Sequence, residues 1–259
     1  MFFSSYLSTF VYFIVATILF LYVIMDEEVI LMHIIHLSHS GFLVEDDGDY
    51  FLFDPVSPFQ GPKDYERLFV FVSHAHHDHF KPDCFNAFYK EERAHFIFSR
   101  DIEENISKPS IANLHILDNY ESVDIEEVHI ESYGTTDAGN SYFVSAHGVN
   151  YFHSGDLNWW HWKRMSDQEL KVEEEDYKRE VDRLRGKSID YAFVPVDPRL
   201  EEYAYLAINY FIKTIKPKFV IPMHSFRELD FYKDLERHVN LMDTTLIPID
   251  EENQEILSI

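Results

Sequence analysis

A short apolar run that leads directly into a histidine-rich segment is the feature that most constrains how this chain can fold. Residues 68–72 read Leu-Phe-Val-Phe-Val, and residues 73–79 read Ser-His-Ala-His-His-Asp-His. An unbroken apolar run of this length is typical of a strand that is buried on both faces of a sheet. The polar side chains that follow it would emerge at the strand's carboxyl end, where open α/β sheets place their ligand sites. The segment therefore predicts a functional site at a sheet edge.

The composition of this segment indicates a metal. Four histidines and one aspartate lie within residues 74–79, and burying them without partners would cost much free energy. Imidazole and carboxylate groups together suit zinc, iron or manganese. In a tight loop, His74 and His76 can bind one ion, while Asp78 and His79 can turn toward a second. The alternative is a surface histidine cluster, which the preceding strand and the helix expected after it disfavour.

Two later segments follow the same pattern, because each is an apolar strand that ends in a potential ligand. Residues 149–156 read Val-Asn-Tyr-Phe-His-Ser-Gly-Asp, and residues 219–224 read Phe-Val-Ile-Pro-Met-His. The carboxylate of Asp156 can bridge two ions, and His224 can complete the shell of an ion held by Asp78 and His79. Three strand ends thus supply one predicted site.

Taken together, these motifs resemble the metallo-β-lactamase fold superfamily over residues 33 to about 226. The branch that contains L-ascorbate-6-phosphate lactonase is the most similar, on three features. These are His-Ser-Gly-Phe-Leu-Val-Glu at residues 39–45, Phe-Asp-Pro at 53–55, and Lys-Pro-Lys-Phe-Val-Ile-Pro-Met-His at 216–224. The resemblance implies an α/β (α+β) fold, a four-layer αββα sandwich with the metal site at one edge.

The resemblance also implies a role for each site residue. The implied ligands are His74, His76, Asp78, His79, Asp156 and His224. The first two hold one ion, Asp156 bridges, and the other three hold the second ion. Asp54 orients a ligand histidine from behind, as such carboxylates do. Asp78 is the expected catalytic residue, because it would ligate and orient the attacking water.

The sequence departs from the family pattern at one ligand. A third histidine for the first ion is expected between the 74–79 loop and the strand that precedes Asp156, but the matching stretch, residues 131–144, contains none. Asp137 is the best substitute there, and Thr135 or Thr136 is a weaker one. Loss of an imidazole weakens this position, so we expect one or two Zn²⁺ ions, with Mn²⁺ or Fe²⁺ as alternatives favoured by the added carboxylate.

Three other positions allow both a functional and a structural interpretation. The aromatic segment 156–162, Asp-Leu-Asn-Trp-Trp-His-Trp, is either a wall of the substrate pocket or a packed loop. His161 within it is more typical of packing. His39 and Asp197 are candidates for groups that support the ligands or touch substrate, and are equally compatible with plain turn formation.

A bound divalent metal lowers the pKa of water and polarises a carbonyl or phosphoryl oxygen. The leading hypothesis is therefore a metal-dependent hydrolase that acts on a small-molecule ester, lactone or phosphodiester. The alternative is a catalytically weak metal-binding or sensing protein of the same fold. A nuclease is disfavoured, because 46 acidic against 22 basic residues give a net charge of −24, which repels a nucleic acid. The oligomeric state is not predicted.

The remaining expectations concern domains and elements. Residues 1–31 are an apolar segment without a charged side chain before Asp26. Either residues 2–24 anchor the protein in a membrane, or translation starts at Met25 or Met32 and the protein is cytoplasmic. Residues 32–259 are expected to form one metallo-β-lactamase-like domain. We expect strands over 33–37, 42–45, 50–53, 68–73, 95–98, 114–117, 123–132, 141–145, 149–153, 191–194, 219–222 and 245–249. Helices are expected over 82–90, 167–185, 201–215 and 229–241.

Overall fold

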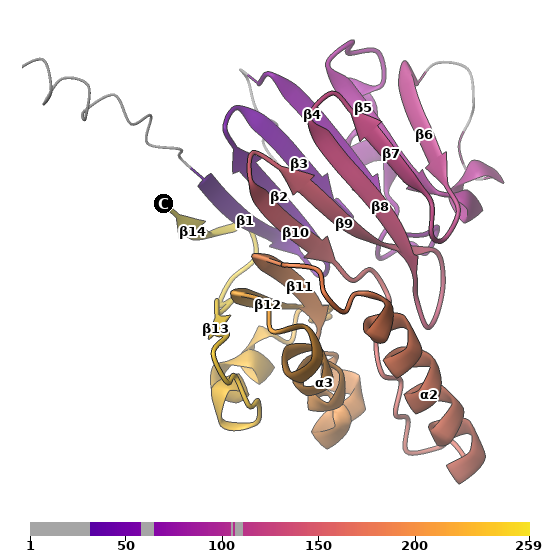
Figure 1. The fold of residues 1–259 in the computed structure, drawn as a ribbon, viewed down its shortest axis with the longest axis vertical. Coiled ribbons are helices and arrows are strands. Elements are labelled where there is room, and N and C mark those ends of the chain that lie inside the picture. The colour runs from indigo at the N-terminus through magenta and orange to yellow at the C-terminus, as the bar shows by residue number, and fades with distance from the viewer. Residues whose placement is uncertain (1–31, 58–64, 105, 107–110) are drawn as a thin grey trace, which may run out of the picture. The chain divides into compact units, whose positions relative to one another are not determined.

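The apolar runs of the sequence assemble into two facing sheets. The computed structural model describes residues 32–57, 65–104, 106 and 111–259. The first sheet has the order β14-β1-β2-β3-β4-β5-β6, and the second has the order β13-β12-β11-β10-β9-β8-β7 (Figure 1). The expected membrane segment, residues 2–24, and the alternative start at Met25 fall within residues 1–31, outside the described part, whereas Met32 is the first residue of β1. Within the described ranges, no helix has the length and apolar character that crossing a membrane requires.

The strand bounds follow the predicted runs closely. The first sheet consists of β1 (Met32–Ser38), β2 (Gly41–Asp46), β3 (Asp49–Phe53), β4 (Arg67–Val72), β5 (Ala94–Ser99), β6 (Asn113–Leu117) and β14 (Gln254–Ser258). The second consists of β7 (Ser122–Ile125), β8 (Val128–Gly134), β9 (Asn140–Ala146), β10 (Val149–His153), β11 (Tyr191–Pro195), β12 (Phe219–Met223) and β13 (Thr245–Leu246). Strands β3 to β6 are mutually parallel, and so are β10 to β13.

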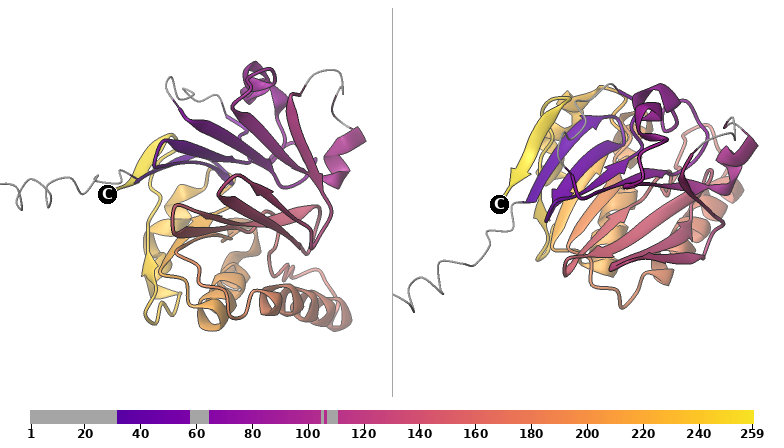
Figure 2. Two further views of the ribbon diagram at one scale, coloured as in Figure 1. Left: turned by 45° about the horizontal axis from the view of Figure 1, so that its top comes forward. Right: turned by 90° about the horizontal axis from the view of Figure 1, so that it is seen from above.

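Aromatic side chains fill the space between the two sheets. Phe53 of β3 lies 4.7 Å from Phe71 of β4 and 5.9 Å from Phe193 of β11, measured between ring centroids, and Phe42 of β2 lies 4.4 Å from Phe193. All four rings are fully buried. Burial of such large rings is the main favourable term in packing the sheets together. Figure 2 shows the two sheets face to face.

The outer faces of the two sheets are covered in different ways. The second sheet carries α3 (Tyr205–Ile215), whose Phe211 stacks on Phe152 of β10, and α2 (Asp167–Arg183) packs against α3. A capping box of Ser166 and Glu169 starts α2, as such boxes do. Among the described residues, the first sheet is covered by 3-10 helices, at Pro82–Cys84, Asn86–Phe88 and Arg100–Glu104. The αββα sandwich is confirmed.

Several predicted elements differ in the structure. The helix expected over 82–90 is two 3-10 helices, because Phe85 between them has φ −139° and is fully buried. The expected helix over 201–215 begins only at Tyr205, since Glu201 has φ 54°. The segment Leu229–Arg237 is 3-10 helix, the strand expected over 245–249 covers only Thr245–Leu246, and β14 was not predicted.

The expected strand over 123–132 was wrong as one element, because it is a hairpin of β7 and β8. The turn lies at Glu126, which has φ 53°, and Glu127. Arg67 of the opposite sheet forms ion pairs with both glutamates and, at 2.6 Å and 2.9 Å, with the buried Asp49. The turn is therefore stabilised by a contact between the sheets and not by a local Gly, Pro or Asn.

Candidate metal centre

The predicted ligands meet because parallel strands end at the same edge of their sheet. In the first sheet, Asp54 follows β3 and the 74–79 loop follows β4. In the second sheet, Asp156 follows β10 and His224 follows β12. The two edges face each other, and the turn between β1 and β2 adds His39. The site thus draws its side chains from both sheets.

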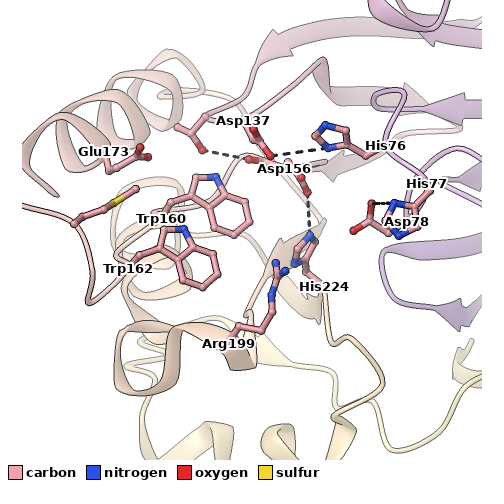
Figure 3. Close-up of a pocket in the computed structure, with 12 residues that line it drawn as sticks. His76, His77, Asp78, Asp137, Asp156, Trp160, Trp162, Glu173, Arg199 and His224 are labelled. Carbon is pink, nitrogen blue, oxygen red and sulfur yellow. Dashed lines mark hydrogen bonds and ion pairs between the residues drawn. The ribbon is translucent and has the colours of Figure 1, made fainter. Parts of the chain in front are cut away.

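These side chains form two groups that share one carboxylate. In each group, one nitrogen or oxygen of every member lies within 4.8 Å of the others; the groups are His74, His76, Asp156 and His39, Asp78, His79, His224. Asp156 also reaches the second group, because its Oδ1 lies 3.1 Å from the Nε2 atoms of both His79 and His224, while its Oδ2 lies 3.4 Å from His74 Nε2. Figure 3 shows Asp156 between His76 and His224. This is the arrangement that a bridging role requires.

A buried serine and aspartate orient two of the histidines. Asp54 accepts hydrogen bonds from the backbone N–H and the hydroxyl of Ser73, each 2.7 Å long, and lies 2.7 Å from His79 Nδ1. Because the Ser73 hydroxyl donates to Asp54, it accepts from His74 Nδ1 at 2.9 Å. Both rings therefore carry their proton on Nδ1 and direct the lone pair of Nε2 toward the centre.

The third buried histidine has a partner of its own. Asp197, fully buried, lies 3.3 Å from Nδ1 of His224. Arg199 holds this carboxylate through its Nε and Nη2 atoms, and the backbone N–H of Arg199 donates to it at 2.9 Å. Asp197 is thus both a turn former and the residue that orients His224, the two roles that its sequence left open.

One glycine allows the segment with Asp137 to lie against the end of β4. Gly139 has φ +68°, and a Cβ atom there would lie 2.0 Å from the Ser73 carbonyl oxygen and 2.6 Å from Cβ of His74. The next residue, Asn140, donates its backbone N–H to the same carbonyl at 2.8 Å. Only glycine fits such an approach, so this position fixes the distance between the 135–139 loop and the first histidine.

The donor set fits a divalent transition-metal ion. The Nε2 atoms of His74, His79 and His224 and Oδ1 of Asp156 are buried without a hydrogen-bond partner of good geometry. Such atoms each cost about 1–3 kcal/mol when left unsatisfied. A cation in each ligand group, with Asp156 shared between the groups, would satisfy all four atoms, and imidazole with carboxylate suits zinc, iron or manganese. His76, about half exposed, completes the first group from the solvent side.

The charged groups of the centre shift one another's pKa values. Burial opposes ionisation of His79, but the carboxylates of Asp156 and Asp54 outweigh it and hold the pKa of His79 well above its usual range. Asp156 and Asp197 likewise outweigh burial and raise the pKa of His224. Burial and the neighbouring His79 lower the pKa of His74 to about 4. Against the effect of burial, His79 and His224 hold the pKa of Asp156 well below its usual range.

A cavity of about 460 Å³ opens onto the centre. His76, Asp78, Asp156 and His224 lie on one side of it, and Trp160, Trp162 and Met165 form an apolar wall (Figure 3). The two indole rings are parallel to within 2°, with centroids 6.0 Å apart. The segment 156–162 therefore lines the pocket, whereas His161 packs on Tyr203 at 4.0 Å.

Some residues at the cavity differ from expectation. Asp137 lines it, half exposed, with Oδ2 4.0 Å from His76 Nδ1, but belongs to neither ligand group. Helix α2 also lines the cavity, through Glu173. Its amphipathic pattern carries no sign of that placement. His77 lies at the rim of the cavity, with its side chain 99% exposed.

Replacing Asp54 tests how the histidines are oriented. We expect Asp54→Asn to lower metal affinity by about 10- to 100-fold, because loss of a partner behind a ligand has effects of this size. The measurement is a competition titration with a chromophoric chelator, and Asp243→Asn, at an exposed position, is the control. Equal affinities in the two variants would contradict the assigned role.

Two facing mixed sheets with histidines and aspartates at their strand ends define the metallo-β-lactamase fold. The model of the family described as the β-lactamase superfamily domain matches residues 33–224. The chain therefore belongs to this superfamily. The narrower resemblance to the lactonase branch stays a prediction.

Solved structures share the fold at low sequence identity. The metallo hydrolase Igni18 from Ignicoccus hospitalis has a TM-score of 0.62 and 16% identity, covering 88% of this chain and 98% of its own. The metallo-β-lactamase fold protein YhfI from Bacillus subtilis has a TM-score of 0.59 and 11% identity, covering 88% and 99%. CmlA, a diiron β-hydroxylase from Streptomyces venezuelae, has a TM-score of 0.56 and 12% identity, covering 88% and 54%. No curated protein matches significantly. These similarities show a shared fold.

Proposed function

We propose that this protein is a metal-dependent hydrolase of a small-molecule ester, lactone or phosphodiester. The observation that carries the proposal is the placement of Asp156 between two groups of histidines that face a cavity of about 460 Å³. A cavity of this volume suits a small molecule. The net charge of −24 argues against a nucleic acid.

Each residue of the centre has its own expected role. His74, His76 and Asp156 would hold one ion, and Asp78, His79 and His224 would hold the other with the shared Asp156. A bound divalent ion supplies Lewis acidity and lowers the pKa of water toward neutrality. Asp78, about one quarter exposed, faces the cavity and is placed to orient a water molecule by accepting its hydrogen bond. Trp160 and Trp162 pack against the substrate and keep bulk water away.

The experiment uses two neighbouring histidines as a matched pair. The purified protein is analysed for bound metals and assayed on a panel of esters, lactones and phosphodiesters, with and without a chelator. His76→Ala should lose turnover, and His77→Ala should keep most of it, because His77, although it lines the cavity, is 99% exposed and belongs to neither ligand group. Metal binding without turnover on any substrate would favour the non-catalytic metal-binding or sensing alternative.

The missing third imidazole leads to a prediction about metal preference. We propose that the carboxylate of Asp137, near His76, favours Mn²⁺ or Fe²⁺ relative to Zn²⁺ in the first group. Asp137→His should then shift the ratio of bound zinc to manganese upward, because an imidazole replaces an oxygen ligand. Elemental analysis after loading with an equimolar mixture measures the ratio. An unchanged ratio would exclude Asp137 as a ligand.

A further inference from the structure

His39 occupies an unexplained position in the centre. It lies in the turn between β1 and β2 with φ 55°, and only 6% of its surface is exposed. Its Nε2 is buried without a hydrogen-bond partner, 3.6 Å from Oδ2 of Asp78. Its ring centroid is 4.3 Å from that of His224. By position alone, His39 would be a fourth ligand beside Asp78, His79 and His224.

The hydrogen bond at the other ring nitrogen argues against that role. The backbone N–H of Phe226 donates to Nδ1 of His39, with 3.3 Å between the nitrogens. A nitrogen that accepts a hydrogen bond carries no proton, so the proton of the neutral ring is on Nε2. A protonated nitrogen has no lone pair for a metal. His74 and His79 are the reverse case, since their Nδ1 atoms face acceptors and their Nε2 atoms face the carboxylate of Asp156.

A second contact fixes the orientation of His39. Its carbonyl oxygen accepts a hydrogen bond from the backbone N–H of His224 at 3.1 Å. The 224–226 segment therefore holds both the backbone and the ring of His39. Turning the ring to expose an unprotonated nitrogen would break the bond from Phe226 and leave that buried N–H unsatisfied, at a cost of about 1–3 kcal/mol.

We propose that His39 is not a metal ligand but a hydrogen-bond donor that positions Asp78. Its Nε2–H is directed at Oδ2 of Asp78, and so selects which carboxylate oxygen is left for an ion and for water. The 3.6 Å separation is longer than a hydrogen bond, and contacts of this kind shorten when the centre is filled. The assignment rests on the proposed function only where turnover is the readout.

The test compares a donor with a non-donor at this position. His39→Gln keeps an N–H at a similar reach, His39→Leu removes it at similar volume, and His224→Ala removes a proposed ligand. We expect both His39 variants to keep the metal content of the wild type, whereas His224→Ala loses metal. Turnover should fall by about 10- to 100-fold in His39→Leu and be restored largely in His39→Gln.

Two further readouts are independent of turnover. Nitrogen-15 NMR of the wild-type protein should show His39 as the Nε2–H tautomer, both without metal and after loading with zinc. The visible spectrum of the cobalt-loaded protein should indicate the same number of nitrogen and oxygen ligands in His39→Leu as in the wild type. Loss of metal in both His39 variants, or loss of the Nε2 proton on zinc binding, would identify His39 as a ligand and overturn the proposal. Equal turnover in all His39 variants would also overturn it.

Discussion

Asp156→Asn is expected to reduce turnover by on the order of 10³-fold or more, because Lewis-acid stabilisation is worth several kcal/mol and about 1.4 kcal/mol corresponds to a factor of ten. The substitution keeps the size of the side chain and removes its charge. Asp156 is the residue that contacts both ligand groups, with Oδ1 near His79 and His224 and Oδ2 near His74. A neutral amide in its place would leave each ion without its shared anionic ligand.

The measurement is turnover together with the number of metal ions per chain after dialysis. The control is Asp46→Asn, which also replaces a fully buried carboxylate by an amide. Asp46 lies at the far end of β2 and bonds to the hydroxyl of Tyr151 at 2.7 Å; burial raises its pKa, so loss of its charge should be tolerated. Two ions and normal turnover in Asp156→Asn would disprove the bridging role.

Metal binding is expected to compete strongly with protons. Because the pKa values of His79 and His224 are raised against the effect of burial, chiefly by Asp156, both rings keep a second proton, on Nε2, to higher pH than an ordinary histidine does in the metal-free protein. A metal must displace these protons before Nε2 can ligate. His74, with its pKa lowered by burial and by His79 to about 4, is already neutral.

The apparent affinity should therefore fall by about tenfold per pH unit for each proton displaced, below the raised pKa values. The affinity falls as the pH is lowered, because protons on the two histidines stabilise the metal-free form. Calorimetry at pH 7 in buffers of different ionisation enthalpy should show that protons are released when the metal binds, above all from His79, whose pKa is raised most. The His79→Gln variant should release fewer protons when it binds metal. No proton release from the wild-type protein would contradict this account.

Much of the fold was predictable because buried strands carry continuous apolar runs. The run at 68–72 and its polar ending placed β4 and the 74–79 loop correctly, and Asp156 and His224 lie where the ends of β10 and β12 bring them. Parallel strands ending at one edge turn a sequence pattern directly into proximity. Turns and short helices were less predictable. The β7–β8 turn depends on Arg67, which is distant in sequence.

The supporting residues of the centre were only partly predictable. Asp54 was expected behind a ligand, but His39 and Asp197 allowed several interpretations, because their roles depend on partners from other segments. The tautomer of His39 depends on Phe226, and the partner of Asp197 is His224. The sequence around a single histidine or aspartate in a turn does not indicate such a contact. Sequence patterns identify ligands better than they identify the groups that orient them.

The pairing of β14 with β1 has a consequence for how the centre forms on the ribosome. His33 and Glu255 are 222 residues apart yet in contact, and the backbone N–H of Asn253 bonds to Leu37 at 3.1 Å, two residues before His39. A nascent chain synthesised as far as His224 has every proposed ligand but lacks β14, which pairs with β1 on the side opposite to β2. Long-range pairing of this kind forms late. The centre should therefore acquire its final geometry only after residues 253–258 have left the exit tunnel.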